Sequence, residues 1–215
     1  MNRFPLCIIP AGGKATRMGD LCKDVPKCLL LVNGKPILRH ILDYWRDYAA
    51  MIRVVVTPDQ VKQVKEWAVY DEVLAKPDLL NLPQAIAWAF ERGIPFDNCV
   101  VVLGDCLVCG AFAWDHLIYP YNGIGVMDGD SDFARSYAVQ ARGGVVMGVE
   151  EKPRLGMGVY FFDQVAMPIL WKAESITDAV AEVARRERLA AVPFTGDYLN
   201  CSYPEDLQRW DKSNG

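Results

Sequence analysis

Short, continuous apolar runs recur along the first half of the chain. Such runs are typical of strands that are buried on both faces of a parallel sheet. Residues 28–32 fit a further short strand, which a turn at Asn33 and Gly34 follows. The longer runs that predict strands lie at residues 6–9, 52–56, 72–75 and 99–103.

Between these strands, apolar residues recur at the spacing of a helix. The clearest helix starts at Pro36 and places Ile41 and Trp45 on one face, with charged residues on the other. Two more helices are predicted, one starting at Thr57 and one over residues 82–92. The alternation predicts an α/β fold, a Rossmann-like, doubly wound and mostly parallel sheet flanked by helices. Ligands of such sheets bind beyond the carboxyl ends of the strands.

The second half of the chain carries weaker patterns. Alternating residues over 136–141 and 145–149 predict a hairpin, and residues 189–194 predict a strand. Ser175 and Asp178 have the spacing of a capping box and predict the start of a helix.

Composition limits the class of protein. A chain of 215 residues that is 52% hydrophobic is long enough for one substantial core, so we expect a single domain over residues 1–215. The net charge is −4 and the basic residues are dispersed, which argues against nucleic-acid and membrane partners and favours a small ligand. The seven cysteines are irregularly spaced and no apolar run approaches 18 residues, so we expect a cytoplasmic protein. We also expect it to act alone or as a homo-oligomer.

The segment from Ile8 to Lys27 carries the strongest chemical pattern. A predicted buried strand runs into small residues at positions 11–13, where backbone N–H groups can approach an anion closely. Lys14 and Arg17 follow within reach, so the segment is typical of a polyphosphate cradle. A tight turn with solvated basic residues remains the alternative at this point.

Neither common glycine-rich phosphate motif fits this segment. The spacing from Gly13 to Gly19 is wrong for G-x-x-x-x-G-K-[ST], Asp20 follows Gly19, and no G-x-G-x-x-G is present. Residues 12–18, the pair Pro26 and Lys27, and residues 34–38 resemble the opening motifs of the sugar-phosphate nucleotidyltransferases. One position departs from that family, because its second loop glycine is Ala15 here, and alanine tolerates a positive φ poorly. The resemblance implies the nucleotide-diphospho-sugar transferase type of fold. It also implies nucleotide binding by Ala11, Gly12, Gly13, Lys14, Thr16 and Arg17.

Asp105 follows the apolar run at residues 99–103, at the end of a predicted strand. A carboxylate beside a phosphate loop suits Mg²⁺, which prefers one or two carboxylates together with phosphate oxygens. The resemblance implies the same role, because the family has its metal-binding aspartate in a Leu-Gly-Asp sequence. Taken alone, Asp105 would more simply cap the following turn.

Three further motifs of that family are present in the expected order. Glu151 and Lys152 match a Glu-Lys-Pro motif, which implies contacts to the sugar hydroxyls and to the sugar phosphate, with Ala138 at a neighbouring binding position. The strand that follows this motif in the family matches residues 158–162. Residues 198–207 resemble the family's closing motif, whose second metal-binding aspartate is Asn200 here.

The base-reading positions of the family correspond to Lys76 and Asn81. A lysine can donate to a carbonyl oxygen but cannot offer a paired donor and acceptor to uracil or thymine, which disfavours thymidine.

One thiol motif and one acidic motif do not fit a zinc site or a calcium site. Cys106 and Cys109 form a C-x-x-C without further ligands for zinc, so we expect unpaired thiols. The aspartates at positions 128, 130 and 132 do not fit a calcium loop, because Phe133 stands where glycine is required. They form an acidic turn or the D-x-D of a metal-dependent glycosyltransferase.

The leading hypothesis is an Mg²⁺-dependent enzyme that transfers a nucleoside monophosphate from an NTP to a sugar 1-phosphate. Arg17, Lys27 and Asp105 are its predicted catalytic residues. A cytidylyltransferase of a phosphorylated alcohol or phosphonate, and a catalytically reduced nucleotide-sugar binding module, remain alternatives. The glycosyltransferase is a fourth hypothesis.

Overall fold

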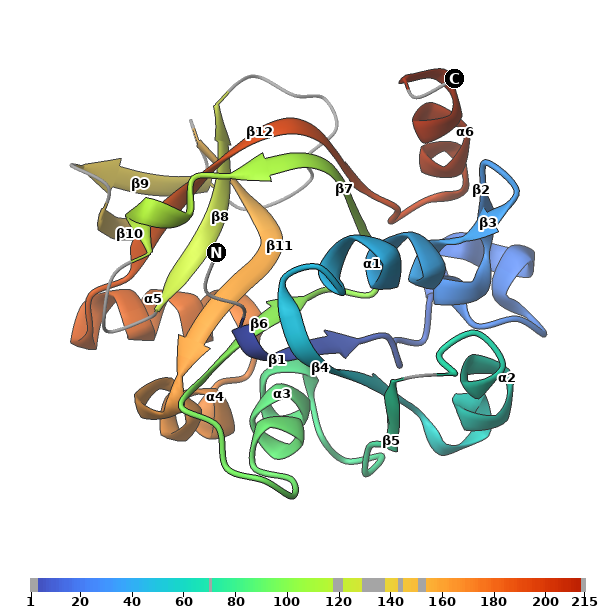
Figure 1. Ribbon diagram of the computed structural model, residues 1–215, viewed down its shortest axis with the longest axis horizontal. Helices are drawn as coiled ribbons and strands as arrows, with labels where there is room; N and C mark the ends of the chain where they lie inside the picture. Colours follow the sequence, from blue (N-terminus) through green and yellow to red (C-terminus); the bar gives the residue numbers. More distant parts are fainter. Residues whose placement is uncertain are drawn as a thin grey trace.

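A sheet of ten strands runs through the molecule, and helices cover both of its faces (Figure 1). The computed structural model describes residues 4–69, 71–117, 122–128, 138–142, 145–150 and 154–213. The strand order is β5-β4-β1-β6-β11-β8-β12-β10-β9, with β7 paired to β12, and a separate small sheet contains β2 and β3. The predicted α/β fold is therefore confirmed.

The strands are β1 (Phe4–Pro10), β2 (Leu31–Val32), β3 (Lys35–Pro36), β4 (Ala49–Val56), β5 (Glu72–Ala75), β6 (Asn98–Val102), β7 (Cys106–Phe112), β8 (Gly123–Asp128), β9 (Ala138–Arg142), β10 (Val145–Glu150), β11 (Arg154–Asp163) and β12 (Ala190–Asn200). The helices are α1 (Ile37–Trp45), α2 (Val61–Lys65), α3 (Leu82–Phe90), α4 (Met167–Lys172), α5 (Ile176–Arg186) and α6 (Pro204–Ser213). Short 3₁₀ helices include η1 (Thr16–Cys22) and η2 (Lys27–Leu29).

The four strands β5, β4, β1 and β6 are parallel, as the alternation of strands and helices predicts. Ile9 of β1 lies opposite Val54 of β4, and Cys7 lies opposite Val100 of β6. The carboxyl ends of these strands therefore meet at one edge of the sheet. Beyond β6 the sheet becomes mixed, because β11 runs antiparallel to both β6 and β8.

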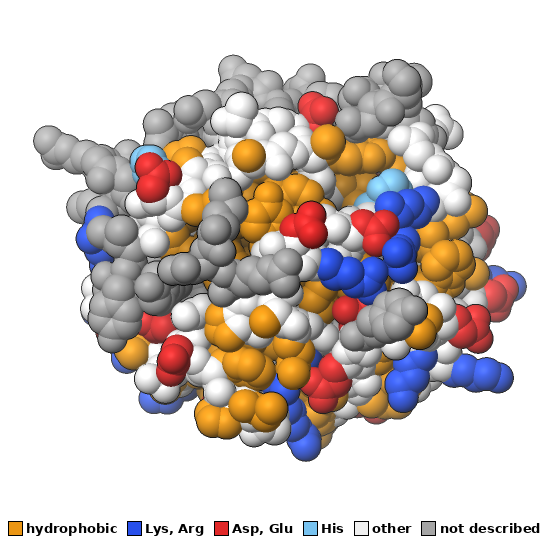
Figure 2. Space-filling model, viewed as in Figure 1, with side chains coloured by type: hydrophobic (Ala, Val, Ile, Leu, Met, Phe, Trp, Pro, Cys, Tyr) orange, Lys and Arg blue, Asp and Glu red, His pale blue; other side chains and the backbone are white. Residues whose placement is uncertain are grey.

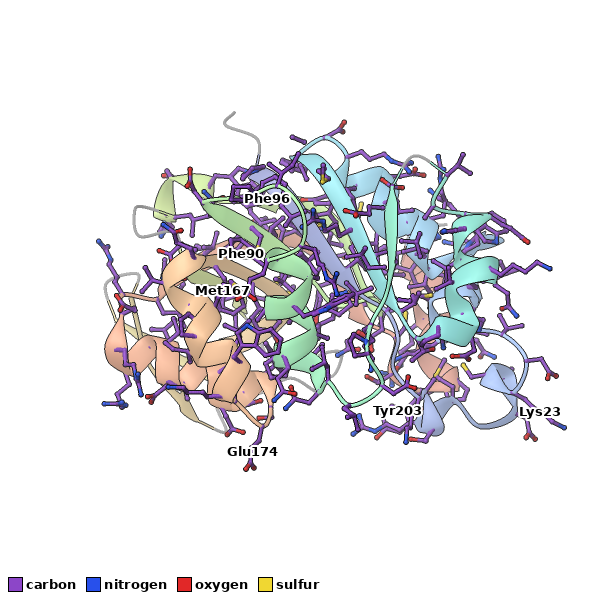
Figure 3. All side chains as sticks on the ribbon, turned by 90° about the horizontal axis from the view of Figure 1, so that it is seen from below. Lys23, Phe90, Phe96, Met167, Glu174 and Tyr203 are labelled. Carbon is purple, nitrogen blue, oxygen red and sulfur yellow. The ribbon has the colours of Figure 1, made fainter. Side chains whose placement is uncertain are left out.

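Two apolar cores lie on opposite faces of the sheet. On one face, α1 buries Leu42 and Trp45, and α6 adds Trp210. On the other face, α3, α4 and α5 pack together, and Figure 3 shows Phe90 of α3 and Met167 of α4 among their side chains. In the described part of the chain, no helix is both long enough and apolar enough to cross a membrane.

Charged side chains of both signs are intermixed on the face seen in Figure 2. On the outer side of α1, the carboxylate of Asp43 pairs with Lys35 at 2.6 Å and with Arg39 at 2.8 Å. The exposed side of this helix is therefore stabilised by opposite charges one turn apart, while its other side is buried.

Several sequence predictions need correction. Residues 28–32 are not one strand, because Lys27–Leu29 form the 3₁₀ turn η2 and only Leu31 and Val32 pair as β2. The elements β7, β8 and α4 were not predicted at all. The predicted hairpin is confirmed by the antiparallel pair β9 and β10, and its turn at residues 143–144 lies outside the described residues. The predicted N-cap of α5 is also confirmed, because Ser175 Oγ accepts the N–H of Asp178 at 3.1 Å.

Candidate active site

The loop after β1 is held against the end of β4. The N–H of Ala11 donates to the carbonyl of Val55 at 2.8 Å, which extends the parallel ladder into the loop. A Cβ on Gly12 would lie 2.8 Å from the backbone nitrogen of Thr57, so only glycine fits there. A Cβ on Gly13 would have no neighbour within 4 Å, so this residue faces open space, where a ligand can approach the backbone.

Ala15 has a left-handed conformation, with φ 49° and ψ 30°. The family loop has glycine at this position, and alanine in this region costs about 1–2 kcal/mol. The loop is therefore strained at this alanine.

Ala15→Gly should therefore leave the free energy of unfolding unchanged or raise it by up to about 1 kcal/mol, because relief of strain offsets the entropy of glycine. Ala184→Gly in α5 is the matched control and should lower the free energy of unfolding by about 1 kcal/mol. Urea unfolding measures both. Equal destabilisation by the two substitutions would show that Ala15 is not left-handed.

Asp105 is held at the end of β6 by two neighbouring strands. The N–H of Gly104 donates to the carbonyl of Pro10 at 3.1 Å, and a Cβ on Gly104 would lie 2.7 Å from the Cβ of Ala11. The carbonyl of Asp105 accepts the N–H of Cys201 at 2.8 Å, which ties it to the residue after β12. The backbone around this carboxylate is therefore fixed from both sides.

Lys27 and Asp105 form an ion pair, although 78 positions separate them in the sequence. Lys27 Nζ lies 2.5 Å from Asp105 Oδ2, and the two side chains are 16% and 25% exposed. Lys27 begins η2, whose turn is closed by the N–H of Leu30 donating to the Lys27 carbonyl at 3.1 Å. Because water screens this pair only in part, each charge depends on the other or on a ligand that replaces it.

A cleft of about 430 Å³ opens beside this ion pair. Its walls are the segments that follow β1, β5 and β6, together with the side of α3. Three lysines (Lys14, Lys27 and Lys76) and two aspartates (Asp78 and Asp105) line it, which leaves one net positive charge. The predicted residues Ala11, Gly12, Gly13 and Asn81 line it as well. Asp78, Leu80 and Leu82 also line it and were not predicted, although their place directly after the strand at residues 72–75 was a usable signal.

Lys76 and Asn81 lie in the same wall of the cleft but differ in what their side chains contact. Lys76 Nζ lies 3.3 Å from the carbonyl of Leu80 and keeps further donors for a ligand. Asn81 is the N-cap of α3, because its side-chain oxygen accepts the N–H of Gln84 at 3.0 Å. Its amide donates to the carbonyl of Ala173 at 2.9 Å. Asn81 therefore already supports the fold, and its base-reading role stays a prediction.

Asn81→Ala tests these two roles against each other. We expect the free energy of unfolding to fall by about 1–2 kcal/mol, because the variant loses the cap of α3 and the bond to Ala173. Nucleotide preference should not change. Thermal unfolding and activity with four nucleoside triphosphates measure the two effects. Ser175→Ala, which removes the cap of α5 and its hydrogen bond to the Asp178 carboxylate, is the control. A changed base preference at unchanged stability would instead support base reading by Asn81.

Arg17 and Thr16 do not line the cleft in this structure. Both are exposed at the start of η1, and the Arg17 guanidinium lies 5.8 Å from the ring centre of Tyr203. Tyr203 lies toward the same end of the molecule as Lys23 in Figure 3. The predicted phosphate contact of Arg17 therefore stays a prediction.

Of the three residues predicted for the sugar phosphate, the structure describes Ala138 alone. Glu151 and Lys152 lie outside the described residues, as does Asp130 of the rival D-x-D motif. Ala138 begins β9, and its backbone pairs with Leu155 of β11.

Asp105 is the carboxylate best placed to hold Mg²⁺. No group of three or more His, Cys, Asp or Glu side chains that could hold a metal occurs among the described residues. Mg²⁺ fits here nonetheless, because it is often bound by one or two carboxylates and completed by substrate phosphates and water. Asn200 ends β12 opposite Cys106, and its side-chain oxygen accepts the hydroxyl of Ser202 at 2.9 Å. That oxygen has a second lone pair, so Asn200 stays a predicted ligand.

All seven cysteines are free thiols. Cys106 is buried and Cys109 is exposed, which agrees with unpaired thiols in the C-x-x-C segment. Burial raises the pKa of Cys28 and of Cys201 to about 12. Burial also raises the pKa of Cys106 and of Tyr198. The thiols of Cys28, Cys106 and Cys201 are therefore protonated at neutral pH, and none of the three has the electropositive, exposed setting of a nucleophile.

Residues 7–123, more than half of the chain, match the MobA-like NTP transferase domain family. The chain belongs to this family. The glycine loop, Lys27 and Asp105 all lie within the matched residues. The predicted resemblance to the sugar-phosphate nucleotidyltransferases is confirmed.

Curated relatives match this chain over all or part of its length. A 2-C-methyl-D-erythritol 4-phosphate cytidylyltransferase of Bacteroides thetaiotaomicron is 45% identical over 56 residues, which cover 26% of this chain and 24% of that protein. The bifunctional protein GlmU of Methanocaldococcus jannaschii is 22% identical over 231 residues, which cover 95% of this chain and 53% of that protein. The chain thus spans about half the length of GlmU and about a quarter of the length of the cytidylyltransferase.

Solved structures share the fold of this chain. An inositol-1-phosphate CTP transferase of T. maritima superimposes with a TM-score of 0.80 at 13% identity, covering 99% of this chain and 98% of the other. A UTP-bound UGPase of Acinetobacter baumannii gives a TM-score of 0.79 at 17% identity, covering 100% and 94%. At 13% and 17% identity, the likeness establishes the fold alone.

Proposed function

We propose that this chain transfers a nucleoside monophosphate from an NTP to a sugar 1-phosphate and releases pyrophosphate. The observation that carries the proposal is the Lys27–Asp105 pair, which lies in a cleft beside the open backbone of Gly13. Membership of a nucleotidyltransferase family supports the same chemistry.

The reaction needs no general base. A phosphate monoester has a second pKa of about 6 and is mostly dianionic at neutral pH, so its oxygen can attack the α-phosphate directly. The difficulty is to bring two anions together and to stabilise charge on the departing pyrophosphate. Alignment and fixed positive charge therefore supply the catalysis.

The residues of the cleft suit these tasks. Gly12, Gly13 and Lys14 offer backbone and side-chain donors to the triphosphate, and Lys27 can hold the α-phosphate while it keeps one donor on Asp105. Asp105, with Asn200, would hold Mg²⁺, which neutralises phosphate charge when bound. Arg17 would grip the outer phosphates, and Glu151, Lys152 and Ala138 would bind the sugar phosphate.

A cytidylyltransferase of a phosphorylated alcohol is the second candidate. One relative favours it, the 2-C-methyl-D-erythritol 4-phosphate cytidylyltransferase of Bacteroides thetaiotaomicron, at 45% identity over 56 residues. A probable glucose-1-phosphate cytidylyltransferase of Bacillus subtilis, 35% identical over 60 residues, is named for a sugar 1-phosphate and so supports the first candidate, with cytidine as the base. A binding module with reduced turnover is the third, because Ala15 is strained and Asn200 contributes no charge.

Pyrophosphate release from four nucleoside triphosphates, each combined with sugar 1-phosphates and with phosphorylated alcohols, tests the proposal. We expect release with at least one sugar 1-phosphate and only in the presence of Mg²⁺. Release with phosphorylated alcohols alone would favour the second candidate. Nucleotide binding without release from any pair would favour the binding module and overturn the proposal.

A further inference from the structure

A chain of buried polar groups leads from β11 to the carboxylate of Asp105. The N–H of Gly158 donates to the hydroxyl of Tyr198 at 3.0 Å, and that hydroxyl lies 3.3 Å from the sulfur of Cys106. The thiol of Cys106 donates to Asp105 Oδ1 at 3.6 Å. The other carboxylate oxygen, Oδ2, faces Lys27.

Counting protons fixes the direction of these bonds. Cys106 has a single S–H, and this S–H donates to Asp105 Oδ1. The sulfur must then accept the hydroxyl proton of Tyr198, whose oxygen already accepts the N–H of Gly158. The reverse direction would leave the hydroxyl proton of a buried tyrosine unpartnered, which is costly.

Strands β7, β11 and β12, which carry Cys106, Gly158 and Tyr198, pack so closely here that no larger side chain fits between them. Cys106 is fully buried, and Tyr198 is 5% exposed. A Cβ on Gly158 would lie 2.3 Å from the sulfur of Cys106, so the thiol occupies the space that a side chain on β11 would need. Its position opposite Oδ1 is therefore set by packing and by hydrogen bonds.

We propose that Tyr198 and Cys106 are positioning residues for Asp105. They hold Oδ1 from behind, so that Oδ2 stays turned toward Lys27 and the cleft. The inference rests on the proposed function, in which Asp105 is the metal ligand. Partners of this kind commonly change metal affinity by about 10–100-fold when they are removed, because they orient the ligand.

The test is the dissociation constant of Mn²⁺ in the presence of a nucleoside triphosphate, measured by electron paramagnetic resonance. Cys106→Ala should weaken Mn²⁺ binding by about tenfold. Tyr198→Phe should weaken Mn²⁺ binding less, because the Cys106 thiol can still donate to Oδ1. Cys106→Ser should bind Mn²⁺ more tightly than Cys106→Ala and close to the wild type, because a hydroxyl can also donate to Oδ1. The double variant Cys106→Ala, Tyr198→Phe should match Cys106→Ala alone, because the two groups act in series.

Cys99→Ala is the matched control, because Cys99 is an equally buried thiol on β6 that is not part of this chain of groups. It should leave the dissociation constant unchanged, and thermal unfolding checks that each variant is folded. Equal affinities of Cys106→Ala and the wild type would overturn the inference alone, as would additive losses in the double variant. If Cys106→Ala does not fold, unchanged affinity in Tyr198→Phe overturns it. Absence of Mn²⁺ binding by the wild type would overturn the proposed function as well.

Discussion

Lys27→Ala is expected to lower the rate of nucleotidyl transfer by about 10²–10³-fold, the usual effect of removing one fixed donor to a developing negative charge. Lys27 is held by η2 and by Asp105, so its ammonium is in place before the substrate arrives. The rate of pyrophosphate release at saturating substrate measures the effect, because a group needed mainly in the transition state changes kcat more than KM.

Lys62→Ala is the control for Lys27→Ala. Lys62 is an exposed lysine on α2 that does not line the cleft, and its removal changes the net charge by the same amount. The control should keep wild-type activity. Activity of Lys27→Ala within a few-fold of this control would remove Lys27 from the proposed mechanism.

Asp105→Asn is expected to have the larger effect, a loss of more than about 10³-fold, because it removes the metal-binding charge and also leaves Lys27 without its partner. The amide keeps the shape of the side chain, so the fold should be retained. Pyrophosphate release across a range of Mg²⁺ concentrations measures the loss, and high Mg²⁺ should restore little of it.

Asp115→Asn, at an exposed position outside the cleft, is the control for Asp105→Asn. Combining Asp105→Asn with Lys27→Met should cost less than the sum of the two single losses, because the two side chains contact each other. Full additivity, or near-normal activity of Asp105→Asn at ordinary Mg²⁺, would contradict the assignment of this pair.

The parallel half of the fold was predictable because local pattern and final burial agree there. The apolar runs that became β1, β4 and β6 are buried on both faces, and only a sheet covered by helices on both sides accommodates them. Thr57 and Asn81 begin helices through their own side chains, and such capping is a short-range signal.

The pairing of β7 with β12 was not predictable from local pattern. Gly110 and Gly196 lie opposite each other in this pair, and both have positive φ, at 156° and 135°. A Cβ on Gly110 would lie 2.1 Å from the carbonyl oxygen of Thr195, so the close approach requires glycine. In the sequence these glycines resemble turn residues, and the partners are separated by more than 80 positions.

The candidate site was predictable in its parts but not in its contacts. Lys27 and Asp105 each had a recognisable local motif, but their ion pair depends on how η2 folds back against the end of β6. Arg17 is a different case, because its predicted phosphate contact stays a prediction while its guanidinium lies 5.8 Å from the ring centre of Tyr203. The contacts of Cys106 with Tyr198 and Asp105 depend on the unpredicted strand β7.

The central claim is that one cleft, bounded by Gly13, Lys27 and Asp105, binds the triphosphate. A crystal structure with a non-hydrolysable nucleoside triphosphate and Mg²⁺ tests it most directly. We predict phosphate oxygens within hydrogen-bond distance of the Gly13 N–H and of Lys27 Nζ, with the metal on Asp105. A triphosphate bound elsewhere, with the Lys27–Asp105 pair unchanged, would contradict the claim.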